Sequence, residues 1–152
     1  MKPTDRQLFD SRNSVWLDLG LLIARFGFGG TLILRHGLAK IPALLASPIQ
    51  FFDPLGLGAG PSLGLAIFAE VVCALALIVG YRSRLACLPL IVNFAVIVLV
   101  IHRLQVPGNR GELALLYLVA FLVLCLTGPG RYSLDYWLGA RSHRSSVDSS
   151  PP

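Results

Sequence analysis

The segment Pro61–Gly80 constrains the fold of this chain more than any other stretch. It is apolar enough to cross a bilayer, and it carries a carboxylate, Glu70, at its middle. A helix rises about 1.5 Å per residue, so this segment would reach about 30 Å, the thickness of a hydrocarbon core. At that depth an ionised side chain costs about 3 kcal/mol on insertion scales. We therefore expect Glu70 to be neutral, paired or facing a polar cavity.

The composition places the whole chain in the membrane class. Hydrophobic residues make up 55% of it and charged residues 14%, whereas soluble domains carry about a quarter charged residues. The apolar residues fall into four long continuous blocks, which favours helices over the short alternating strands of a barrel. The predicted fold class is an all-α membrane protein, a four-transmembrane-helix antiparallel bundle.

We divide the chain into three parts from its polarity. They are a lead-in at 1–14, a transmembrane domain at 15–138 and a disordered tail at 139–152. The tail is rich in serine and cannot bury enough apolar surface to fold.

Four spans are predicted within the transmembrane domain, at 15–38, 61–80, 85–101 and from 112 to the helix stop Gly128-Pro129-Gly130. Between the first two spans, residues 39–60 contain helix breakers and the pair Phe51-Phe52. We expect this stretch to be a short amphipathic segment at the membrane surface.

The distribution of basic residues predicts the orientation. The N-terminus, the turn after Gly80 and the tail share one side and hold eight Lys and Arg, against four on the other side. The positive-inside rule then places both termini in the cytosol. It also explains the net charge of +5, so we expect no nucleic-acid partner. The three cysteines form no C-x-x-C motif, which argues against a protein that cycles its own dithiol.

A polar layer is predicted inside the bundle. Arg25 and Glu70 lie nine and ten residues from the expected cytosolic ends of their helices, and thus both about 14 Å deep. Asn93 is predicted to lie at the same depth. We therefore predict an ion pair between Arg25 and Glu70, which either fixes helix register alone or lines a polar pocket. The candidate pocket residues are Arg25, Glu70, Asn93 and Tyr117.

A second group of polar residues is expected toward the opposite, outer face. The candidate site there consists of His36, Lys40, His102 and Glu112. It has three interpretations: a solvated interfacial rim, the mouth of a substrate site, or a metal site. Because the sequence contains no H-x-x-x-H or E-x-x-H pair, we predict no metal.

Several short motifs together resemble the DoxX family, over Trp16 to Leu138. They are Arg35-His-Gly-Leu-Ala-Lys40, Phe51-Phe-Asp-Pro-Leu-Gly-Leu57, Leu77-Ile-Val-Gly-Tyr-Arg-Ser-Arg84, Glu112-Leu-Ala-Leu-Leu-Tyr117 and Gly128-Pro-Gly-Arg-Tyr-Ser-Leu-Asp135. The resemblance implies a multi-pass bundle in the bacterial inner membrane. It also implies kinship with the small subunit of a thiosulfate:quinone oxidoreductase and with membrane parts of oxidative-stress complexes. By the same resemblance Arg25, His36, Lys40, Glu70, His102 and Glu112 are the positions of interest.

Two functions remain open from the sequence. The first is an integral membrane subunit of a quinone-linked redox or oxidative-stress complex, with a quinone as bound substrate and a soluble or membrane partner supplying electrons. The sequence has no flavin fingerprint, haem-attachment motif or iron-sulfur cysteine set, so we expect no intrinsic cofactor. Whether the chain is itself an oxidoreductase subunit stays open, as does homo-oligomerisation. The alternative is a non-enzymatic membrane scaffold that recruits soluble partners.

Overall fold

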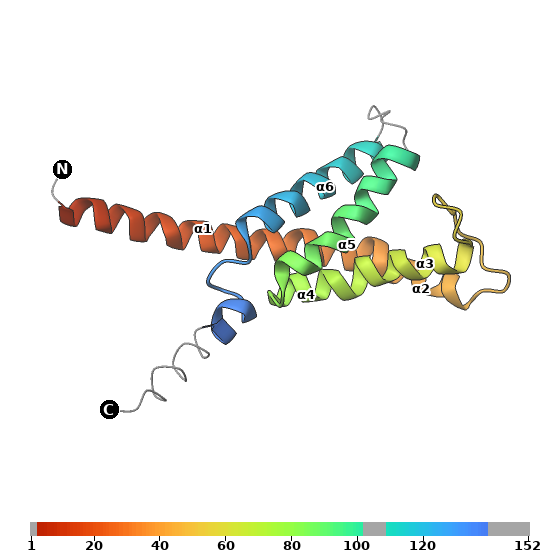
Figure 1. Ribbon diagram of the computed structural model, residues 1–152, viewed down its shortest axis with the longest axis horizontal. Helices are drawn as coiled ribbons and strands as arrows, with labels where there is room; N and C mark the ends of the chain where they lie inside the picture. The colour runs from red at the N-terminus through yellow and green to blue at the C-terminus, as the bar shows by residue number, and fades with distance from the viewer. Residues whose placement is uncertain (1–2, 102–108, 140–152) are drawn as a thin grey trace.

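The computed structural model describes residues 3–101 and 109–139, with side chains described for 15–100 and 111–139. Every regular element in these ranges is helical. In chain order they are α1 (Pro3–Leu32), the π-helical turn η1 (Ile33–Gly37), α2 (Leu38–Leu45), α3 (Ala59–Ile67), the π-helical turn η2 (Phe68–Cys73), α4 (Ala74–Val79), α5 (Ser83–Val96), the π-helical turn η3 (Ile97–Ile101) and α6 (Asn109–Thr127). A short unlabelled helix at 134–139 follows α6 (Figure 1).

These elements join into a few long rods (Figure 1). The first rod runs without a break through α1, η1 and α2, and the second runs back beside it through α3, η2 and α4. The rod of α5 and η3 crosses these two and packs along α6. The N-terminal part of α1 projects beyond all the other helices.

Three of the described helices are long and apolar enough to cross a membrane. They are Val15–Leu45, Ala59–Val79 and Ser83–Val100, and a shorter apolar helix covers Gly111–Thr127. The all-helical, membrane-type fold is thus confirmed. The number of crossings and the cytosolic location of both termini stay predictions.

The distribution of side chains suits a bundle surrounded by lipid. Large apolar side chains on every rod are exposed, among them Ile23, Val92 and Leu126, in a quantity that a water-soluble monomer rarely shows. The interior holds an apolar core shared by the rods: Leu32, Leu77, Leu90, Phe94, Tyr117, Phe121 and Leu124. Ionisable groups are buried in the same interior, which is the pattern expected of polar groups excluded from the acyl chains.

The first apolar helix is longer than predicted, and the connection after it is correspondingly shorter. Helix continues to Leu45, so residues 39–45 are part of this helix and not of a separate segment. The non-helical connection is limited to 46–58. The predicted boundary was wrong because Gly37 continues the helix through a π-helical turn instead of ending it.

Two glycines fix how the first two rods pack. A Cβ at Gly29 would meet Ile78, and a Cβ at Gly37 would lie 2.6 Å from Val71 and 3.1 Å from the Glu70 carbonyl oxygen. The rods are antiparallel, so Gly29 lies level with Ile78 and Gly37 with Glu70. Small residues at such contacts let two backbones approach closely.

The Gly37→Ala variant is therefore expected to be less stable than the wild type by about 1 to 3 kcal/mol, the usual range for overpacking. The added methyl group would push η1 away from Glu70. SDS titration in mixed micelles measures the loss. Gly30→Ala is the matched control, because a Cβ at Gly30 has no neighbour within 4 Å. Equal stability of the two variants would contradict the close contact at Gly37.

Candidate functional site

The polar centre of the bundle consists of Lys40, Glu70 and Asn93. The Lys40 ammonium donates to both carboxylate oxygens of Glu70, and the Asn93 amide donates to Glu70 Oε1 at 3.0 Å. The Glu70 side chain is 2% exposed and that of Lys40 24%. The carboxylate thus lies inside the apolar bundle while its cation reaches partway to the surface. We call these three residues the Lys40 triad.

Irregular helix geometry places Glu70 in this triad. Glu70 belongs to η2, which contacts η1 on the neighbouring rod. π-Helical turns are rare and occur frequently at functional sites, because they shift the direction of the side chains. The close approach at Gly37 brings the start of α2, and with it Lys40, alongside Glu70.

The predicted ion pair between Arg25 and Glu70 is not formed. Arg25 lies twelve residues before Gly37 on the same rod, which corresponds to about 18 Å along a helix. Its guanidinium instead lies beside Gly80, at the far end of the second rod. The prediction failed because it placed the start of the first span and the end of the second at one height, whereas the glycine contacts offset the rods. Arg25 is therefore not part of the Lys40 triad.

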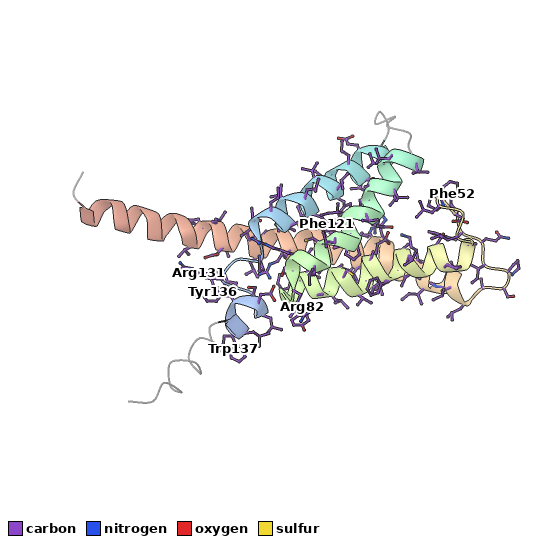
Figure 2. All side chains as sticks on the ribbon, in the orientation of Figure 1. Phe52, Arg82, Phe121, Arg131, Tyr136 and Trp137 are labelled. Atoms are coloured by element: carbon purple, nitrogen blue, oxygen red, sulfur yellow. The ribbon has the colours of Figure 1, made fainter. Side chains whose placement is uncertain are left out.

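Arg25 contributes to a different structure, in which the segment 128–139 folds over one end of the bundle. We call this segment the strap. Arg25 Nη2 donates to the Tyr132 carbonyl oxygen. The Arg131 backbone N–H donates to Asp18 at 3.0 Å, and Asp135 accepts from the N–H groups of Arg82 and Ser83. Figure 2 shows Arg82, Arg131, Tyr136 and Trp137 gathered at this end, which we call the Gly80 end.

Tyr117, a predicted pocket residue, lies in an aromatic cluster. Its ring stacks on Phe94 with centroids 5.0 Å apart, and the His36 ring meets it edge-on at 5.9 Å. Its hydroxyl donates to Thr31 Oγ1 at 2.9 Å. Tyr117 and Thr31 also line an open groove of about 480 Å³ between α1 and α6, which we call the α1–α6 groove.

The remaining predicted site residues are not gathered into a site in the described structure. Glu112 is exposed in the first turn of α6, and His102 lies outside the described residues. Lys40, expected in the outer group, belongs to the triad instead. Among the residues described, no three His, Cys, Asp or Glu side chains are grouped so that they could hold a metal ion.

An apolar groove borders the triad. It has a volume of about 290 Å³ and lies between the α3 rod and α5, with the loop residues Leu55 and Leu57 at its edge. Two of its lining side chains are polar, Ser62 and Asn93. Asn93 is bonded to Glu70, so the groove reaches one member of the triad from the apolar surroundings. We call it the α3–α5 groove.

The loop at the edge of this groove is held by Asp53. Its carboxylate accepts from the Leu57 N–H at 3.1 Å, the Gly58 N–H at 2.6 Å and the Ser62 hydroxyl at 2.7 Å. The hydrogen bond from Ser62, and then that from Gly58, lower the pKa of Asp53 below its ordinary value of 3.8. The ionised carboxylate therefore stabilises the loop against α3.

The contribution of Asp53 to stability is expected to depend on pH. A carboxyl group with a lowered folded-state pKa stabilises the fold above its unfolded pKa of about 4, and this is lost as pH falls through the folded-state value. Asp53→Asn should therefore lower the melting temperature at neutral pH. The difference from the wild type should shrink in a pH series below about 4. A difference that stays constant across the series would contradict this role.

Comparison with known proteins is consistent with the fold. A family model described as DoxX matches residues 20–103. An uncharacterized protein of Haemophilus influenzae is 34% identical over 110 residues, which cover 68% of this chain and 80% of that protein. No solved structure matches the chain.

Proposed function

Because the chain belongs to the DoxX family of membrane proteins, we propose that it is a multi-pass subunit of a quinone-linked redox or oxidative-stress complex in the bacterial inner membrane. The proposed quinone site is the α3–α5 groove beside Asn93. One observation supports this most: Asn93 both lines the groove and donates to a buried carboxylate. An apolar groove with a few convergent polar groups is the usual form of a small-molecule site.

The chemistry of the groove fits a quinone head group. A quinone is a flat apolar ring with carbonyl oxygens that accept hydrogen bonds, and it carries an apolar tail. An amide side chain has two N–H donors, and Asn93 uses one of them on Glu70. The second is available to a quinone oxygen. The groove is open and apolar, so the tail can extend into the acyl chains.

The Lys40 triad would supply and accept the protons of the quinone reaction. Reduction of a quinone to a quinol takes up protons as well as electrons, and the partner protein's donor is oxidised in the same step. Glu70 is the buried ionisable group next to the groove residue Asn93, and Lys40 connects it to a partly exposed position. We assign proton exchange to this pair and electron supply to the partner.

Quinone binding by the purified protein tests the proposal. In nanodiscs, a short-chain benzoquinone should raise the melting temperature of the wild type. Asn93→Leu removes one hydrogen bond to the ligand, which is expected to weaken binding by about tenfold. Tyr117→Phe is the matched control, because Tyr117 lines the α1–α6 groove and keeps its ring stacking as phenylalanine. No shift in the wild type, or equal weakening in both variants, would contradict the α3–α5 site.

The scaffold alternative has its own support in the strap, where the side chains of Tyr132, Tyr136 and Trp137 are exposed. The neutral double variant Lys40→Met/Glu70→Gln separates the two functions. A scaffold should still capture its protein partners from solubilised membranes when the triad is neutral. A quinone-linked subunit should still bind quinone in the α3–α5 groove, which neither residue lines, but should lose quinone reduction in the presence of its partner, because the proton-exchanging pair is gone.

A further inference from the structure

Three hydrogen-bond donors at the Gly80 end have lost water without gaining a partner. Arg25 is completely buried, and its Nε and Nη1 make no hydrogen bond with the described residues. The Ser83 hydroxyl is also completely buried and makes no hydrogen bond with the described residues. Buried donors are nearly always bonded, because desolvation without a partner is unfavourable. This end of the bundle therefore has more donors than the described residues supply with acceptors.

The N-terminus of α5 adds two further donors at the same place. The N–H groups of Arg82 and Ser83 bind the two oxygens of Asp135 at 2.7 and 2.9 Å. A helix N-terminus favours an anion, through its free N–H groups and its dipole. Asp135 is also the carboxylate whose charge acts on Arg25. Arg25 forms no ion pair with Asp135 or with another carboxylate among the described residues.

The location brings this surplus of donors to the level of lipid head groups. Gly80 and Arg82 lie between two candidate spans, one ending at Val79 and the next beginning at Ser83. The exposed cations Arg82 and Arg131 are at the same end in Figure 2. Phosphate groups of lipids, or phosphate ions in the adjoining water, would therefore meet a positively charged surface here.

We propose that the Gly80 end contains a binding site for a phosphate-bearing anion, formed by Arg25, Ser83 and the N-terminus of α5, and that Asp135 occupies it when no ligand is bound. A phosphate group has more acceptor oxygens than a carboxylate. It can therefore satisfy the helix N–H groups together with Arg25 and the Ser83 hydroxyl.

Binding at this site must displace the strap. Ser133 of the strap packs against Gly80, and the Tyr132 carbonyl oxygen holds Arg25 Nη2. The Asp135 N–H is bonded to the Gly80 carbonyl oxygen at 2.9 Å. A phosphate that takes the place of the Asp135 carboxylate would break this anchoring. Phosphate binding is thus coupled to release of the strap, whose aromatic side chains are exposed at this end of the bundle.

Hydrogen exchange of the strap tests the coupling. The full chain is kept in dodecyl maltoside, which carries no phosphate, and receives inorganic phosphate, phosphatidylglycerol, or chloride at equal ionic strength. We expect exchange of the amides at 133–139 to accelerate about tenfold on loss of the anchoring bonds. A response to phosphatidylglycerol alone identifies a lipid head group as the ligand, and a response to inorganic phosphate identifies the free ion. Unchanged or slower exchange, or the same response to chloride, would overturn the proposal.

Variants distinguish a site from a merely structural contact. Arg25→Met should abolish the response, and Ser83→Ala, a milder change, should weaken it. Arg84→Gln removes an exposed cation at the same end and should respond as the wild type does. If Arg25→Met and Ser83→Ala both keep the full response, the buried donors are not the site and the proposal fails. This test does not involve quinone, so its outcome is independent of the proposed function.

Discussion

Replacing Lys40 by methionine is expected to lower the free energy of unfolding by about 3 to 5 kcal/mol, because the Glu70 carboxylate is then buried without its cation. Glu70→Gln should cost less. The Glu70 side chain is 2% exposed and the Lys40 side chain 24%, so a lone ammonium can extend to water where a lone carboxylate cannot. SDS titration in mixed micelles measures both losses, and their order is part of the prediction.

The double variant Lys40→Met/Glu70→Gln, compared with the two single variants in a double-mutant cycle, measures the coupling energy between Lys40 and Glu70. Since both charges are removed together, it should be more stable than Lys40→Met alone. Arg35→Met is the matched control for loss of a cation, because Arg35 is exposed on the same rod, and it should change stability little. Strictly additive losses in the cycle would show that Lys40 and Glu70 do not interact.

Gly80→Ala is expected to lower the free energy of unfolding by about 3 kcal/mol or more. The loss has two causes, the strain of a left-handed backbone and overpacking. Gly80 has φ +77°, a conformation that residues with a Cβ rarely adopt. An added Cβ would also lie 2.9 Å from Ser133 Cα and against the Arg25 guanidinium. The variant should therefore loosen the strap as well, which faster hydrogen exchange at 133–139 would report.

Gly56→Ala separates the two causes. Gly56 has a similar φ of +72°, but a Cβ there has no neighbour within 4 Å. Gly56→Ala should therefore lower the free energy of unfolding by only about 1 kcal/mol, from backbone strain alone. If both variants lose the same stability, the contact between Gly80 and the strap does not contribute.

The secondary structure was largely predictable from the sequence. Long apolar blocks form helices because lipid offers no hydrogen bonds to a backbone, so each span must satisfy its own. The helix stop was also predictable: α6 ends at Thr127, and Gly128 and Gly130 follow with φ of +81° and +73°.

The relation between Glu70 and Asn93 was predictable as well. Their two rods are joined by the tight turn after Gly80, so counting residues from the turn places both side chains at one height. The hydrogen bond between Asn93 and Glu70 Oε1 confirms this level. A short connection fixes the register of the helices that it joins, and the count carries little error.

The partner of Glu70 was not predictable, for the opposite reason. The first two rods are joined by the long connection 46–58, which fixes no register. Their offset is set by the contacts of Gly29 and Gly37 in three dimensions. Each helical turn of offset moves a potential partner by about 5.4 Å. With the first span predicted to end at residue 38, Lys40 was also excluded from the bundle.

The Lys40 triad, to which we assign proton exchange, requires that Glu70 pairs with Lys40 and not with Arg25. Solid-state NMR in bilayers tests this pairing most directly, by measuring dipolar coupling between Glu70 Cδ and the side-chain nitrogens in selectively labelled protein. The Lys40 triad predicts a strong coupling to Lys40 Nζ and none to the Arg25 guanidinium. A strong coupling to Arg25, with none to Lys40, would contradict the pairing.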